Sequence, residues 1–266
     1  MSSLATAWMA ALMGVVEGIT EYLPISSTGH LILVNEWMGK PFSDVFEVVI
    51  QSGAVLAVLV EYRKRFARLA EFRNSTGFSG LRGLFWLGLT TLPAVVLGAL
   101  FHSAIKEVLF TPAVIAVALG VGGVIMIAME RLLPSHDEGG VDGLGWKRAL
   151  GVGFFQCLAM VPGTSRSMAT ILGGRLMGLG RKTAAEYSFF AAVPVLMLAA
   201  VFDLFKEWGS LQRSDWIPYG IGLLVSFGVA RLAIRFLMKL ISRHTLEAFG
   251  WYRLVLSLMV WWWLVY

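Results

Sequence analysis

Long apolar stretches, separated by short charged or Gly/Pro-containing breaks, follow one another along the whole of this sequence. Ten such stretches occur, at residues 4–22, 28–38, 44–62, 84–101, 111–131, 147–160, 165–178, 184–204, 217–238 and 250–265. A helix needs about 20 apolar residues to cross a bilayer, and most of these stretches approach that length. Only 15% of the residues are charged, whereas a soluble domain carries about 25%. We therefore expect an all-α integral membrane protein, a single polytopic domain over residues 1–266.

Three of the ten stretches are too short to span a bilayer, and two of them follow a proline. The short stretches are 28–38, 147–160 and 165–178, and Pro24 and Pro162 break the chain before 28–38 and 165–178. Short apolar pieces interrupted by Pro and Gly are typical of re-entrant helices, which enter and leave a membrane on the same side. At each proline we predict one re-entrant helix pair, with one helix before the proline and one after it.

The two halves of the sequence resemble each other. A shift of 139 residues aligns four pairs of positions, namely Gly14 with Gly153, Glu17 with Gln156, Glu47 with Glu186, and Phe110 with Phe249. Fixed-period self-similarity indicates an internal repeat, which we place at about 1–133 and 140–266. Each repeat would hold one re-entrant pair and three transmembrane helices. Because three is odd, the second repeat would have inverted topology in the membrane.

The cationic residues are distributed unequally between the two expected faces. Fourteen of the 22 Lys and Arg residues lie in the loops at 63–82, 131–148, 175–182 and 239–248. The opposite face receives only five, which are Lys40, Lys106, Lys206, Arg213 and Arg253. Cationic loops remain in the cytoplasm, so we expect both termini on the outer side of the membrane. The two re-entrant pairs would then enter from opposite sides, and the two breaks would meet near mid-membrane. These loops also explain the net charge of +5, and no nucleic-acid partner is expected.

Two glutamates one helical turn apart precede the first break. Glu17 and Glu21 would project from one helical face, where their like charges repel each other. Ionisable groups inside an apolar segment are costly and mark functional sites. A divalent metal, an arginine or a retained proton would compensate the pair. The alternative is a helix end at the aqueous boundary, where a glutamate costs little.

Hydroxyl side chains gather after each proline. The first break carries Ser26, Ser27, Thr28 and His30, and the second carries Ser165, Arg166, Ser167 and Thr170. One hydroxyl suffices to cap a helix, so these clusters exceed that structural need. A helix N-terminus also binds anions. The guanidinium of Arg166 suits phosphate oxygens, although it could equally neutralise Glu17 or Glu21.

This inventory of acids, hydroxyls, an imidazole and an arginine suits phosphoryl transfer assisted by a metal. The sequence contains no Walker-type P-loop and no G-x-G-x-x-G motif. A nucleotide substrate is therefore not expected.

Both breaks resemble the signatures of the bacterial undecaprenyl-diphosphate phosphatases, which are also called bacitracin-resistance proteins. The two motifs are Glu17-x3-Glu21-x2-Pro24-x2-Ser27-x2-His30 and Pro162-Gly-Thr-Ser165-Arg166-Ser167-x2-Thr170. The resemblance extends over essentially the whole chain. In the second half, Met160 stands where the first half has its second glutamate, which suggests that only the first copy of this acidic motif is catalytic.

The resemblance implies a membrane hydrolase that converts undecaprenyl diphosphate to undecaprenyl phosphate and inorganic phosphate. Its active site would face the outside of the bacterial inner membrane. The enzyme would recycle the lipid carrier for cell-wall synthesis and counteract bacitracin. It implies catalytic roles for Glu17, Glu21, Ser27, His30 and Arg166. Candidate phosphate contacts are Ser26, Thr28, Ser165, Ser167 and Thr170. The divalent cation, Mg²⁺ or Ca²⁺, would be held partly by Glu17 and Glu21.

Several alternatives stay open at this stage. The nucleophile is Ser27, with His30 or Glu21 as its base, or else a water molecule or His30 itself. A transporter or flippase for a polyprenyl phosphate is the second functional hypothesis, because inverted repeats with broken helices are a transporter design. Besides the lipid substrate and the surrounding membrane lipids, a second copy of the chain remains a candidate partner.

Overall fold

The computed structural model describes residues 3–73, 76–134, 139–207 and 216–266. Within these residues the chain is helical and contains no strand, which confirms the all-α expectation. The helices are α1 (Ser3–Thr20), α2 (Ser27–Trp37), α3 (Asp44–Glu61), α4 (Arg63–Leu69), α5 (Gly80–Leu109), α6 (Pro112–Leu132), α7 (Trp146–Gln156), α8 (Arg166–Leu176), α9 (Arg181–Glu207), α10 (Trp216–Ile241) and α11 (Glu247–Val260). A π-helical turn, Trp261–Val265, continues α11.

Five described helices are long and apolar enough to cross a membrane. They lie in α5, α6, α9, α10 and α11 with its π-helical turn. A sixth span results if α3 is taken together with α4, which leaves α3 at an angle of 83°. Many large apolar side chains on these helices, such as Phe85 and Leu92 on α5, are exposed. An apolar outer surface of this kind suits contact with lipid, and the protein is a multi-pass membrane protein.

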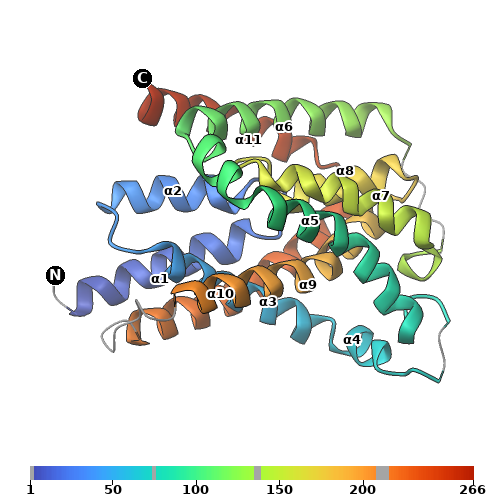
Figure 1. Ribbon diagram of the computed structural model, residues 1–266. Coiled ribbons are helices and arrows are strands. Elements are labelled where there is room, and N and C mark those ends of the chain that lie inside the picture. The colour runs from blue at the N-terminus through green and yellow to red at the C-terminus, as the bar shows by residue number, and fades with distance from the viewer. Residues whose placement is uncertain (1–2, 74–75, 135–138, 208–215) are drawn as a thin grey trace.

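The two short pairs turn back at the prolines, as predicted. α1 runs inward from the end of the molecule that holds both termini, and α2 returns toward it (Figure 1). α7 and α8 form the corresponding pair at the opposite end (Figure 1). The helix ends at both breaks therefore meet in the interior of the molecule.

Helix packing follows the pattern that a two-fold relation between the halves would produce. α1 packs along α10, and correspondingly α7 packs along α5. The pairs α3 with α9 and α6 with α11 each join equivalent helices of the two halves. Figure 1 shows α6 and α11 side by side. Repeats at about 1–133 and 140–266 would produce this exchange of partners; the repeats and their inversion across a membrane stay predictions.

Equivalent glycines allow close contacts in the α1–α10 and α7–α5 pairs. A Cβ added at Gly14 would lie 2.5 Å from the carbonyl oxygen of Gly222 on α10. A Cβ at its repeat mate, Gly153, would lie 2.8 Å from the carbonyl oxygen of Thr90 on α5. Small residues let helix backbones approach each other closely within membranes. The similarity of the halves therefore reflects shared packing as well as shared polar residues.

Ion pairs and hydrogen bonds join the four cationic loops at the end of the molecule opposite the termini. Arg65 binds Asp142 at 2.9 Å, and Arg131 binds Glu247. Arg175 donates to the carbonyl oxygens of Leu133 and Pro134, both at 2.8 Å. Burial opposes ionisation of Asp142, but the hydrogen bonds from Arg65 and the Phe78 amide prevail and lower its pKa. These contacts agree with the expectation that the loops share one face.

One expected position on the other face is wrong. Arg253 does not lie in a loop: it is fully buried within α11. The fold provides three backbone carbonyls for this cation, so burial replaces the expected surface position. Arg213, another of the five, lies outside the described residues.

Candidate functional site

A serine caps the helix that follows each break, and both serines have the same unusual backbone. Ser26 caps α2 with φ 74°, and Ser165 caps α8 with φ 71°. Their hydroxyls accept hydrogen bonds from the amides of Gly29 and Met168, both at 3.3 Å. A positive φ is uncommon for residues other than glycine, and such strain concentrates at functional sites. The two breaks thus have matching geometry and direct two helix N-termini toward the site.

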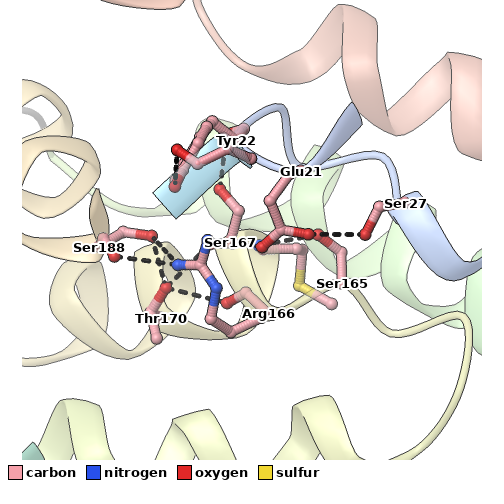
Figure 2. Close-up of polar contacts among 10 residues, drawn as sticks. Glu21, Tyr22, Ser27, Ser165, Arg166, Ser167, Thr170 and Ser188 are labelled. Atoms are coloured by element: carbon pink, nitrogen blue, oxygen red, sulfur yellow. Dashed lines mark hydrogen bonds and ion pairs between the residues drawn. The ribbon is translucent and has the colours of Figure 1, made fainter. Parts of the chain in front are cut away.

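Three residues from the two halves form the polar centre of the site. Glu21 accepts a hydrogen bond from the Ser27 hydroxyl at 2.8 Å and pairs with Arg166 at 3.0 Å. Figure 2 shows the Glu21 carboxylate with Ser27 on one side and Arg166 on the other. The side chains of Glu21 and Arg166 are 4% and 9% exposed, so the pair is almost completely shielded from solvent. This contact confirms that Arg166 neutralises Glu21.

A cavity of about 230 Å³ opens beside this centre. The sequence-predicted residues among its lining are Glu21, Ser26, Ser27, Thr28, Ser165 and Arg166. Five of the six carry a hydroxyl or a cation, and the first residues of α2 and α8 are among them. Backbone N–H groups at helix N-termini favour anions. The cavity therefore combines hydrogen-bond donors and positive charge with one carboxylate.

Glu17 lies one turn behind Glu21 and is fully buried. Neither carboxylate oxygen of Glu17 has a hydrogen-bond partner among the described residues. Among the described residues, no three His, Cys, Asp or Glu side chains lie close enough together to hold a metal ion. Two carboxylates one turn apart do fit Mg²⁺, which proteins hold through one or two carboxylates together with substrate phosphates. The unpartnered oxygens of Glu17 agree with such a role.

The ring of His30 is held away from the cavity by two hydrogen bonds. Its Nδ1 lies 2.7 Å from the carbonyl oxygen of Ser26, and its Nε2 lies 2.7 Å from the hydroxyl of Tyr252. Because a carbonyl only accepts, Nδ1 carries the proton, and Tyr252 donates to Nε2 of the neutral ring. His30 thus supports the N-terminus of α2, while Ser27 is bonded to Glu21.

The comparisons with known proteins agree with this geometry. Residues 10–259 match the family model described as "Bacitracin resistance protein BacA". The chain belongs to this family. A relative named undecaprenyl-diphosphatase from Aromatoleum aromaticum is 47% identical over 95% of this chain and 92% of its own length. Relatives of the same name from Nitratidesulfovibrio vulgaris and Pseudomonas putida are 46% and 45% identical over 97% and 96% of this chain, and 98% and 93% of their own lengths.

Two of the sequence-predicted phosphate contacts lie outside the cavity of this BacA-family protein. The hydroxyl of Ser167 donates to the carbonyl oxygen of Tyr22 at 2.8 Å. The hydroxyl oxygen of Thr170 lies 2.7 Å from that of Ser188, and Figure 2 shows this contact. Both side chains are fully buried or nearly so and hold neighbouring groups in place. Their role as phosphate contacts stays a prediction.

Sequence reasoning missed three residues that the BacA-family fold brings to the site. Ser188 on α9 accepts from Arg166 through its carbonyl oxygen at 2.9 Å. Tyr252 and Arg253 come from α11, far from both motifs along the chain. Ser188 gave no sequence signal. Arg253 did give one, because it is a single cation inside the last apolar stretch.

The contacts of His30 predict different results for two substitutions. His30→Asn keeps a donor near the carbonyl of Ser26, so we expect phosphate release within about tenfold of the wild type. His30→Ala removes this hydrogen bond and should lower phosphate release substantially further. The kcat of each purified variant on a polyprenyl diphosphate measures the difference. Equal inactivity of the two variants would contradict a supporting role and favour His30 as base or nucleophile.

Proposed function

We propose that this protein hydrolyses undecaprenyl diphosphate to undecaprenyl phosphate and inorganic phosphate. The observation that carries the proposal is the contact of Glu21 with both Ser27 and Arg166. It joins a hydroxyl nucleophile, its proton acceptor and a cation beside one cavity. The names and high identity of the BacA-family relatives support the same activity.

Ser27 is the proposed nucleophile. Its oxygen attacks the terminal phosphorus, and its proton passes to Glu21, whose carboxylate oxygen lies 2.8 Å away. The bond from this phosphorus to the bridging oxygen breaks, and the polyprenyl monophosphate leaves. Water then attacks the phosphoserine, the bond from phosphorus to the Ser27 oxygen breaks, and Glu21 returns its proton to that oxygen as inorganic phosphate leaves.

Arg166 and the two helix N-termini stabilise the charge on the phosphate groups. The Nε of Arg166 has no partner among the described residues, so a donor is available on a side chain already held by Glu21 and Ser188. Preorganised donors of this kind act strongly in a water-poor site. Ser26, Thr28 and Ser165 line the same cavity and offer further contacts.

Glu17 and Glu21 are the proposed holders of a divalent cation, Mg²⁺ or Ca²⁺. When bound, such an ion neutralises phosphate oxygens and polarises the phosphorus. The buried and unpartnered oxygens of Glu17 support this assignment.

The proposed location is the bacterial inner membrane, with the site open to the outside. Charge supports this orientation, because the cationic loops lie at the end opposite both termini and cationic loops remain in the cytoplasm. Activity there would return the lipid carrier to cell-wall synthesis. It would also lower the amount of diphosphate that bacitracin can sequester.

A test of this function measures phosphate release from a polyprenyl diphosphate by the purified protein in detergent, with no membrane gradient. We expect release that depends on a divalent cation, and a trapped phosphate on Ser27. A transporter or flippase would release none, because transport needs no nucleophile. A phosphate on His30, or release with no phosphoenzyme, would replace Ser27 by His30 or by water.

A further inference from the structure

Arg253 is a permanently charged side chain buried in the interior of a membrane protein. It is 0% exposed and donates to three backbone carbonyls. Its Nη1 lies 3.3 Å from the oxygen of Pro24, and its Nη2 lies 2.9 Å from that of Gly163 and 3.1 Å from that of Ala118 on α6. A buried cation is strongly destabilising unless it is well paired. These contacts therefore need an explanation beyond packing.

Two of the three contacted carbonyls occupy the same position in the two breaks. Pro24 lies two residues before Ser26, the cap of α2, and Gly163 lies two residues before Ser165, the cap of α8. One guanidinium thus holds the two breaks together through equivalent backbone groups. Its planar and rigid fork suits such a bridge better than a lysine does.

The two break carbonyls that Arg253 holds lie close along the chain to residues that line the cavity. The residue after the first cap is Ser27, and the residue after the second cap is Arg166. The separation of the two breaks therefore sets the separation of these side chains. A displacement of about 1 Å in such a site can cost on the order of 100-fold in rate.

The neighbouring helix is shaped around the guanidinium. A Cβ added at Gly122 on α6 would overlap the Nη2 atom of Arg253. The same Cβ would come within 3.0 Å of Met168. Gly122 thus leaves the space that Arg253 needs in order to reach the carbonyls of Ala118 and Gly163.

We propose that Arg253 is a positioning residue that holds the N-termini of α2 and α8 at the separation needed to bind one diphosphate. The proposal rests on the phosphatase function proposed above. Arg253 acts through the carbonyls of Pro24 and Gly163 and does not touch the substrate. The C-terminal helix thereby becomes a part of the site that neither break motif contains.

The first experiment compares kcat and KM of the wild type, Arg253→Met and Arg253→Lys on a polyprenyl diphosphate in detergent. We expect Arg253→Met to lower kcat by about 100-fold, with a smaller change in KM. Arg253→Lys should restore part of the loss, since it keeps the charge and its ammonium can still donate to some of the carbonyls, although it lacks the planar fork. Each rate is divided by the fraction of protein that is folded at the assay temperature, which the thermal unfolding curve of that variant gives.

The second experiment displaces the guanidinium without removing it. Gly122→Ala should lower kcat in the wild type but add little to Arg253→Met, because both changes disturb one contact. Gly228→Ala on α10 is the matched control, because a Cβ there has nothing within 4 Å. We expect the control to keep wild-type kcat.

The third measurement needs no activity. Spin labels at Trp37→Cys on α2 and Leu176→Cys on α8, in a Cys157→Ala background, report the distance between the two helices. Both labelled positions are exposed. We expect one narrow distance distribution with Arg253 and a shifted or broader one in Arg253→Met.

The outcomes separate the two proposals. An unchanged distance distribution in Arg253→Met, or a kcat within threefold of the wild type, overturns the positioning role. Additive losses for Gly122→Ala and Arg253→Met also count against it. A wild type that releases no phosphate overturns the proposed function, while the distance measurement still decides whether Arg253 holds the helices.

Discussion

Glu21→Gln lowers phosphate release by on the order of 1,000-fold or more, because the amide cannot accept the proton of Ser27. The substitution keeps the size of the side chain but removes its charge. It also leaves Arg166 buried without its counter-charge, and the loss of one partner of a buried ion pair costs about 3–5 kcal/mol of stability. The expected variant therefore unfolds at a lower temperature and is almost inactive when folded.

Measurement of kcat and of the thermal unfolding midpoint in detergent separates these effects. Glu36→Gln is the matched control, because Glu36 on α2 pairs with Lys40 at the surface. Exposed pairs contribute about 0–1 kcal/mol, so this control should keep both activity and stability. A Glu21→Gln variant that retains more than a tenth of the wild-type kcat would exclude Glu21 as the proton acceptor.

Arg166→Ala is expected to lower kcat/KM by on the order of 1,000-fold, since it removes a preorganised cation from the cavity. Arg166→Lys keeps the charge but cannot bond Glu21, Ser188 and a phosphate oxygen through one planar group. Lysine should therefore recover only a minor part of the loss.

The same phosphate-release assay gives both values, with Arg235→Ala as the control. Arg235 is also paired with a glutamate, Glu61, but its side chain is 56% exposed. We expect the control to stay within twofold of the wild type. Full activity of Arg166→Lys would mean that charge alone is needed, and activity of Arg166→Ala would contradict the assigned role.

Most of the fold follows from local properties of the sequence. Apolar length predicts the spans, and Pro24 and Pro162 predict the breaks, because a proline removes a helical hydrogen bond and a cluster of hydroxyl residues follows each of these two. Pro93 and Pro194, which lie within long apolar stretches, do not end α5 and α9. The cost of charge in an apolar segment points to Glu21 and Arg166. Their contact joins residues 145 positions apart; the sequence offered it as one of several ways to compensate the two glutamates, with Glu17 or Glu21 as the partner of Arg166.

The contribution of α11 to the site was not predicted for a physical reason. Near an aromatic pair, Trp251 and Tyr252, a cation resembles an interfacial anchor. Only the helical face distinguishes the two cases, because Arg253 shares its face with Gly250 and Leu256, which are also buried. The partners of Arg253 are backbone carbonyls, and such partners leave no trace in the residue types of a sequence.

The separation of Glu21 and Arg166 along the chain also has a consequence for biosynthesis. A ribosome adds Glu21 to the growing chain 145 residues before it adds Arg166. During that interval the first re-entrant pair has neither its cation nor its packing partner α10. Glu21 must therefore stay in contact with water until the second half arrives. The site can mature only after nearly the whole chain has entered the membrane.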